Sequence, residues 1–293
     1  MAIAIDFMIA PFIASILLIF IMAYFGIHVI EREIIFIDIA LAQIAALGGT
    51  VALVINRLQT GVEGHAHDHG AGLIMSYLFC LLAAMMFTAL KNKKITIPLE
   101  ALIGIAYAVA TTAAVILLDK AAGSDVHIHD MLTGTILWVT WPQIIRLGIV
   151  VIVVAGFHFI FREKFKTVTL SYSEVENKPV NARLWDFLFY FTFGIVIVEA
   201  VNIGGILTIF AFLIIPASIS ALFAVRWTFR VLIGLFAGGI STLLGLYLSW
   251  VMDIPCSPAI ILFLAVFLVL AVIIRTVFNA LNRTRTGKMQ VSE

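Results

Sequence analysis

Three histidines and an aspartate fall within seven residues of a glycine-flanked polar stretch, Gly-His-Ala-His-Asp-His-Gly at 64–70. Imidazole nitrogens and carboxylate oxygens are the donors that zinc and similar divalent cations bind in proteins. A solvated connection is the alternative explanation, but the alternation of histidine with other residues favours metal attraction. We assign that role to His65, His67, Asp68 and His69. A second patch of the same chemistry consists of His127, His129 and Asp130.

The rest of the chain is strongly apolar, with 63% hydrophobic and only 12% charged residues. A soluble domain has about 45–50% apolar and about 25% charged residues. We therefore predict an all-α fold, a polytopic transmembrane helical bundle surrounded by membrane lipid. No basic stretch is long enough to follow a nucleic-acid backbone, so we expect no nucleic acid as a partner. The spacing of Cys80 and Cys256 indicates neither a disulfide framework nor a zinc knuckle.

Apolar segments long enough to cross a hydrocarbon core of about 30 Å predict nine spans. The pair that meets at Gly204-Gly205 is the least certain, which makes eight the alternative, and Pro216 should kink the span that contains it. The segments lie near 7–29, 34–55, 72–90, 98–118, 143–161, 185–202, 205–225, 231–250 and 257–276. We expect one transmembrane domain, 1–276, followed by a basic cytoplasmic tail, 277–293.

The lysines and arginines give the bundle an orientation. All but three of the 18 cations, Arg57, Lys120 and Arg146, fall on one side of the predicted spans. The positive-inside rule makes that side cytoplasmic, with the N-terminus outside and the C-terminus inside. Both histidine-containing patches then lie outside. The start of the chain lacks a basic region and a cleavage site, so we expect no removable signal peptide.

Two motifs are missing from the sequence. It contains no Gly-x-x-x-x-Gly-Lys-Ser/Thr, so the chain does not bind ATP through a P-loop. It also contains no His-Glu-x-x-His, which leaves an intramembrane zinc protease unsupported.

Ionisable and amide side chains inside spans are costly and therefore indicate function. Asp38 lies about one turn into the second span and Gln43 lies near its middle, whereas Glu199 and Asn202 lie near the outer end of the sixth. Asp38 is either a pathway carboxylate or an acid favoured by the helix N-terminus. Gln43 is either a ligand or an interhelical hydrogen-bonding group. Glu199 has no neutralising neighbour in the sequence.

Other noticeable residues favour structural roles. The cluster of His28, Glu31, Arg32 and Glu33 at the end of the first span is interpreted as an interfacial anchor. His158, near the inner end of the fifth span, is interpreted as structural. The small-xxx-small pair Gly234 and Gly238 favours close packing within the protein rather than a subunit interface.

Five blocks in order resemble the integral-membrane permease subunits of the metal-ion ABC transporters that take up zinc, manganese or iron. The blocks are FIDIALAQIAALG at 36–48, LIGIAYAVATTAAVILL at 102–118, HIHDMLTGTIL at 127–137, GGILTIFAFLIIPASISALF at 204–223 and LYLSWVMDIPCSPAIIL at 246–262. The resemblance covers about residues 10–275. The Ile-Pro-Ala-Ser step and the late Asp-Ile-Pro turn are its more specific parts.

The resemblance implies a homodimeric, multi-pass permease of a prokaryotic cell membrane, working by alternating access at the dimer interface. Its partners would be a cytoplasmic ATP-binding subunit and an extracytoplasmic metal-binding protein. The divalent ion, zinc or manganese, would be the substrate, with no permanently bound cofactor. The chain would be a transporter component with no catalytic residue of its own, and not an enzyme. A self-contained, proton-coupled secondary metal transporter is the alternative, and a scaffold or sensor that has lost transport is a third.

The chain departs from the family pattern in two places. Family members carry an aspartate followed four residues later by a histidine in the second span. Here Asp38 and Gln43 are five apart, so their side chains diverge on a regular helix unless a π-bulge intervenes. The ATPase-coupling segment, 171–181, is short and contains Pro179. Its candidate contact residues are Ser173, Glu174, Glu176 and Asn177.

Overall fold

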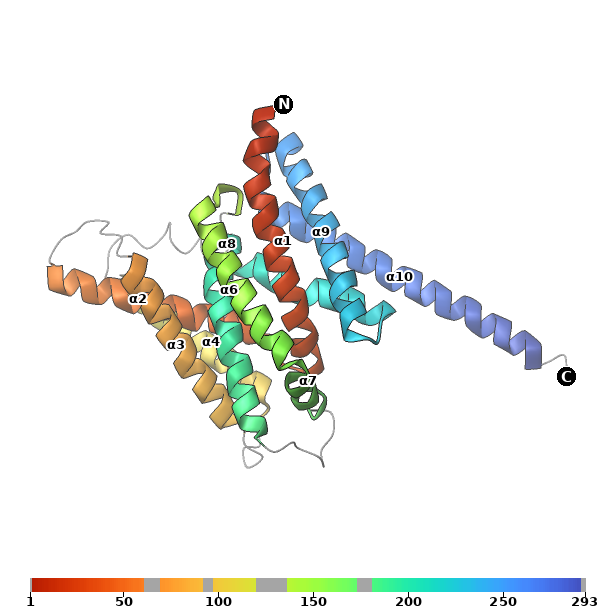
Figure 1. Ribbon diagram of the computed structural model, residues 1–293, viewed down its shortest axis with the longest axis horizontal. Coiled ribbons are helices and arrows are strands. Elements are labelled where there is room, and N and C mark those ends of the chain that lie inside the picture. Colours follow the sequence, from red (N-terminus) through yellow and green to blue (C-terminus); the bar gives the residue numbers. More distant parts are fainter. Residues whose placement is uncertain (1, 61–68, 92–96, 120–135, 173–180, 291–293) are drawn as a thin grey trace.

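The computed structural model describes residues 2–60, 69–91, 97–119, 136–172 and 181–290. Its regular elements are all helices, and that part of the chain contains no strand (Figure 1). Its elements are α1 (Ala2–Glu31), α2 (Ile37–Thr60), α3 (His69–Leu90), α4 (Leu99–Asp119), the short 3-10 helix η1 (Ile136–Trp138), α6 (Trp141–Ile160), α7 (Arg162–Leu170), α8 (Ala182–Phe223), α9 (Trp227–Met252) and α10 (Cys256–Gln290). The predicted all-α bundle is confirmed.

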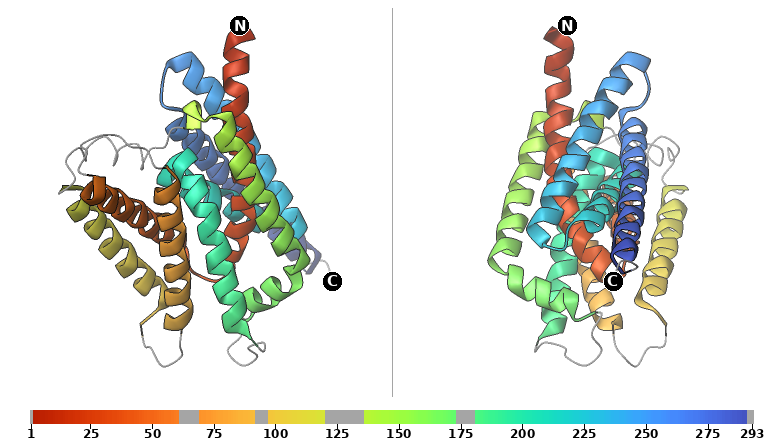
Figure 2. Two further views of the ribbon diagram at one scale, coloured as in Figure 1. Left: turned by 60° about the vertical axis from the view of Figure 1, so that its left-hand side comes forward. Right: turned by 90° about the vertical axis from the view of Figure 1, so that its right-hand side faces the viewer.

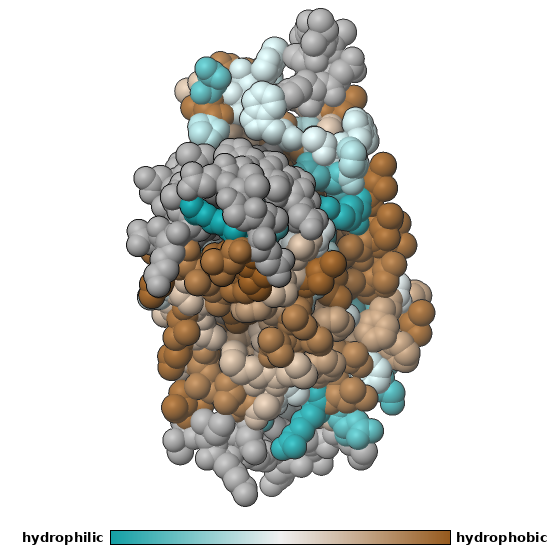
Figure 3. Space-filling model, turned by 90° about the vertical axis from the view of Figure 1, so that its left-hand side faces the viewer, coloured by the Kyte–Doolittle hydropathy of each residue, from teal (hydrophilic) through white to brown (hydrophobic). Residues whose placement is uncertain are grey.

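Eight of the described helices are long and apolar enough to cross a membrane, all except η1 and α7. Figure 3 shows hydrophobic side chains across the middle of one face, with hydrophilic ones toward its two ends. The N-terminus and the C-terminus lie toward opposite ends of the bundle (Figure 2), as an odd number of crossings requires. The helix α10 continues past residue 276, and a separate tail at 277–293 stays a prediction.

The helix α8 accounts for two predicted spans, because the chain is not helical throughout it. Gly205, inside α8, has φ 73° and ψ 161°, a conformation that residues with a Cβ rarely adopt. The neighbouring Gly204 packs against Leu18 in the middle of α1. A straight helix of 42 residues would be about 63 Å long, twice the hydrocarbon thickness. The break therefore lies where the apolar sequence passes from one predicted span to the next.

The two halves of α8 run in opposite directions along α1. In the first half, the ring of Phe189 lies 5.5 Å from that of His28, near the end of α1. The chain then reaches Leu18 at the break, as described above, and in the second half Leu213 packs against Gly26. This reversal supports two spans and nine in total. The dihedrals at Pro216 remain helical, so the reversal is made at Gly205, and a kink at Pro216 stays a prediction.

Glycines allow α1 to approach α8 and α9 closely. A Cβ on Gly238 would lie 2.5 Å from Ile19 Cγ2, and one on Gly234 would lie 3.1 Å from Ala23 Cβ. These contacts lie between α9 and α1 of one chain. They confirm that this small-residue pair packs inside the protein.

Gly26→Ala should destabilise the protein. The new Cβ would lie 1.9 Å from the Leu213 carbonyl oxygen, so α1 and α8 would have to separate. Overpacking of this kind costs about 1–3 kcal/mol, more than the roughly 1 kcal/mol that alanine gains over glycine in a helix. Thermal unfolding in detergent measures the effect. Gly104→Ala is the matched control, because a Cβ there meets nothing within 4 Å, and it should leave the melting temperature unchanged or slightly raised.

Candidate functional site

Asp38 is a buried carboxylate at the start of a span. It is the second residue of α2, and only 2% of its surface is exposed. Its Oδ1 atom has no hydrogen-bond partner among the described residues, and none of the salt bridges in that part of the chain includes it. Burying a charge without a partner is costly. Its first-turn position lowers that cost through the helix N-terminus, and both interpretations of Asp38 agree with this position.

Gln43 does not share a face with Asp38. The helix α2 is α-helical from Ile37 to Thr60, with no π-turn, so five residues correspond to about 140° of rotation. Both side chains are buried, Gln43 with 5% of its surface exposed. No π-bulge therefore brings Asp38 and Gln43 onto one face, and the paired arrangement of the family's ligands is absent from α2. Within the described residues, no three His, Cys, Asp or Glu side chains form a metal-binding group.

Glu199 is the centre of a clamp between three helices. It is fully buried in α8; Arg146 Nε of α6 donates to its Oε2 atom at 2.7 Å, and the Tyr77 hydroxyl of α3 donates to its Oε1 atom. Glu199 has no cation near it in the sequence, but Arg146, 53 residues away, neutralises it in the structure. Asn202 is exposed and donates to the Val198 carbonyl of its own helix at 2.8 Å. A role for either in the metal pathway stays a prediction.

Several predicted site residues lie outside the described part. The backbone of His69 begins α3, but its side chain is not described. The residues beyond the described ranges are His65, His67, Asp68, His127, His129, Asp130, Ser173, Glu174, Glu176 and Asn177. Their roles in metal attraction and ATPase coupling remain predictions.

The interfacial-anchor interpretation is wrong for two members of the cluster at the end of α1. His28 and Arg32 are 1% and 2% exposed, because α7 and α8 cover them. Arg32 donates to Asp186 of α8 through Nη1 at 2.9 Å and to Thr169 of α7 through Nε at 2.9 Å. His28 shares a hydrogen bond of 2.8 Å with the same threonine hydroxyl. Sequence reasoning missed this network, since the partners are more than 130 residues apart.

The helix α7 was also not expected. Its buried residues Phe165, Val168 and Thr169 follow the three-and-four spacing of an amphipathic helix, a signal that was available in the sequence. The ring of Phe165 stacks on His158 with centroids 4.0 Å apart. His158 also hydrogen-bonds Tyr24 at 3.1 Å and a threonine of α8. Its predicted structural role is confirmed.

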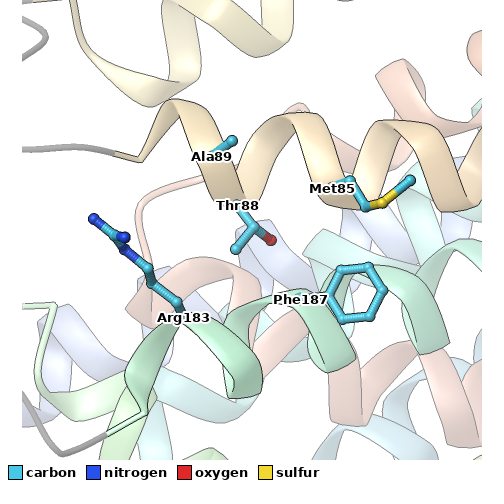
Figure 4. A pocket seen from close by; sticks show the side chains of 5 residues that line it. All are labelled: Met85, Thr88, Ala89, Arg183 and Phe187. Atoms are coloured by element: carbon cyan, nitrogen blue, oxygen red, sulfur yellow. The ribbon is translucent and has the colours of Figure 1, made fainter.

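An open cavity of about 390 Å³ lies between the ends of α3 and α8 (Figure 4). In the figure, Arg183 extends away from the apolar side chains of Met85 and Phe187. Thr88 and Ala89 complete the lining. Its one charged group is a cation, so the cavity is unsuited to a metal ion.

Curated relatives of this chain are bacterial membrane proteins. It is 21% identical over 181 residues to the "Probable metal transport system membrane protein" of Chlamydia trachomatis, covering 62% of each chain, less than two thirds of that relative. It is 22% identical to the "Manganese transport system membrane protein MntC" of Listeria innocua, covering 75% of this chain and 82% of that one. It is 27% identical to the "Manganese import system permease protein ScaB" of Streptococcus parasanguinis, covering 80% and 89%.

The fold has a counterpart among solved structures. "PsaBC from Streptococcus pneumoniae in complex with Fab" contains a chain that superposes with a TM-score of 0.73 at 21% identity, covering 92% of this chain and 94% of that one. The model of the ABC 3 transport family matches residues 4–275, close to the range of the five sequence blocks. This chain therefore belongs to the ABC 3 transport family and is a multi-pass membrane permease.

Proposed function

We propose that this chain is the permease subunit of an ATP-driven importer of a divalent metal ion, with manganese the first candidate and zinc the second. Family membership supports the transport class, and two of the relatives above carry manganese in their names. The observation that carries the proposal is Asp38, a carboxylate buried in a span without a cation partner among the described residues. Carboxylate oxygens suit hard divalent ions such as Mn²⁺.

The proposed pathway runs between two copies of the chain. One copy offers the ion a single carboxylate on α2, with one unpartnered oxygen, since Gln43 lies on another face and no ligand group of three forms within the described residues. A homodimer brings two Asp38 side chains to one pathway, and alternating access opens it to each side in turn. An extracytoplasmic binding protein delivers the ion. An ATP-binding subunit contacts 171–181 through Ser173, Glu174, Glu176 and Asn177. The ion is cargo, and no resident cofactor is required.

Reconstitution tests this function. The permease is placed in vesicles with its ATP-binding subunit and metal-binding protein, and uptake of radioactive manganese is followed with and without MgATP. Uptake should require nucleotide. Equal uptake by vesicles that contain the permease alone would establish the secondary transporter instead. Glu199 is a weak candidate for the proton carrier of such a transporter, because it is already paired with Arg146.

The outer histidine stretch should collect metal without being essential. Ordering a glycine-flanked segment around an ion costs conformational entropy of about 1–2 kcal/mol for each residue that becomes fixed. Replacing His65, His67 and His69 together with alanine should raise the manganese concentration for half-maximal uptake severalfold and leave the maximal rate unchanged. Uptake measured over a range of metal concentrations separates the two quantities. Loss of transport at saturating metal would instead make the stretch part of the pathway.

A further inference from the structure

Asp186 is the centre of a buried polar network at one end of the bundle. Its side chain, 3% exposed, accepts from Arg32 Nη1 at 2.9 Å and from Lys91 Nζ at 2.5 Å. The Tyr172 hydroxyl also donates to it, at 2.9 Å. One carboxylate near the start of α8 thus joins the end of α1, the end of α3 and the residues that follow α7.

The same network holds both ends of the segment 171–181. Thr169 and Tyr172 lie at its start and Asp186 lies shortly after its end, and each of them contacts Arg32. The Tyr172 hydroxyl gives its one proton to Asp186, so Tyr190, 3.1 Å away, donates to the Tyr172 oxygen. Burial raises the pKa of Tyr172 well above its ordinary value, which keeps the hydroxyl a donor.

Arg32 connects this network to α2. It stands in the turn between α1 and α2, six residues before Asp38. The turn is hydrogen-bonded, with Ile34 N–H donating to the Val29 carbonyl and Ile37 N–H donating to the Ile34 carbonyl, both at 3.2 Å. The guanidinium also lies 3.9 Å over the Phe189 ring. Arg32 therefore links α7 and the start of α8 to the base of α2 through the four residues 33–36 of the turn.

We propose that Arg32 and Asp186 are positioning residues that transmit movement of α7 and of the start of α8, which flank the segment 171–181, to Asp38 on α2. The inference rests on the proposed function, in which that segment contacts the ATP-binding subunit. Two bonds from one guanidinium, to Thr169 and to Asp186, fix α7 and α8 relative to the turn. Lysine keeps the charge, but its single nitrogen cannot reproduce this fork.

The test measures manganese uptake and ATP hydrolysis in the same vesicles, which contain the permease, its ATP-binding subunit and the binding protein. In Arg32→Lys, hydrolysis should continue while the number of ions moved per ATP falls about fivefold or more, the lower range of coupling effects. Tyr172→Phe retains every charge and should change the same ratio in the same direction, but less. The double variant Arg32→Lys/Asp186→Asn should lower the number of ions moved per ATP by less than the sum of the two single effects, because both substitutions act on the same ion pair.

The matched control is Glu31→Gln. Glu31 lies at the same end of α1 but pairs with Arg230 of α9 at 2.5 Å and not with α7 or α8, and removing its charge should leave the ratio unchanged. A purely structural role for Arg32 would lower the melting temperature of the complex and leave the ratio constant. Metal uptake at the wild-type ratio in both Arg32→Lys and Tyr172→Phe overturns the inference alone. Absence of nucleotide-dependent uptake by the wild-type complex, with manganese and with zinc, overturns the proposed function and the inference together.

Discussion

Asp38→Asn should reduce manganese uptake at least tenfold while the permease assembles normally. The substitution nearly preserves shape and removes the charge of a carboxylate that has no cation partner among the described residues. Replacing a ligand's charge weakens binding of a hard cation by at least the tenfold to hundredfold seen for second-shell changes. Because an unpaired buried charge opposes folding, the melting temperature should stay the same or rise. Uptake and thermal unfolding of the same preparation measure both effects.

Glu100→Gln is the matched control for Asp38→Asn, because Glu100 is likewise an acid in the first turn of a span, α4. It should transport at the wild-type rate. Gln43→Ala should impair uptake less than Asp38→Asn, since a neutral amide contributes little to binding a divalent cation. Gln43→His would restore a family-like donor, although on a different face from Asp38. Full activity of Asp38→Asn would show that the carboxylate acts only at the helix end, and Glu199 would be the next candidate.

Arg146→Gln should destabilise the permease by about 2 kcal/mol. It leaves Glu199 buried without a counter-ion, and removing one partner of a fully buried pair costs about 3–5 kcal/mol. We expect about 2 kcal/mol, less than this range, because the Arg146 side chain is 42% exposed and water screens part of its interaction with Glu199. Glu199→Gln should cost less, since the freed guanidinium can reach water and the amide can still accept from Tyr77. Thermal unfolding in detergent measures the stability of both variants and shows which substitution destabilises the protein more.

The double variant Arg146→Gln/Glu199→Gln decides whether the charge pair explains the effect. Without either charge, most of the stability lost in Arg146→Gln should return. Additive losses would mean that Arg146 stabilises the bundle through packing of its side chain and not through Glu199. Tyr77→Phe is the mild control, because it removes one hydroxyl donor and retains both charges.

The sequence by itself determined the membrane class, the spans and the family. Apolar length suffices for the spans, because a chain in lipid satisfies its backbone hydrogen bonds within each helix. Every predicted segment corresponds to a described helix, and the boundary at Gly204-Gly205 coincides with the dihedral break at Gly205. Pro98 lies just before α4 and Pro142 lies in the first turn of α6, since proline fits helix starts.

Only the tertiary structure decided which polar side chains are already satisfied. Glu199 and Asp38 look alike in the sequence, as single acids within spans, yet Glu199 meets Arg146 and Asp38 meets no cation in the described part of the chain. Arg32 looks like an interfacial cation but is buried against Asp186. Ion pairs and side-chain hydrogen bonds form between helices far apart in the chain, and their existence depends on angstrom-scale placement that hydropathy does not encode.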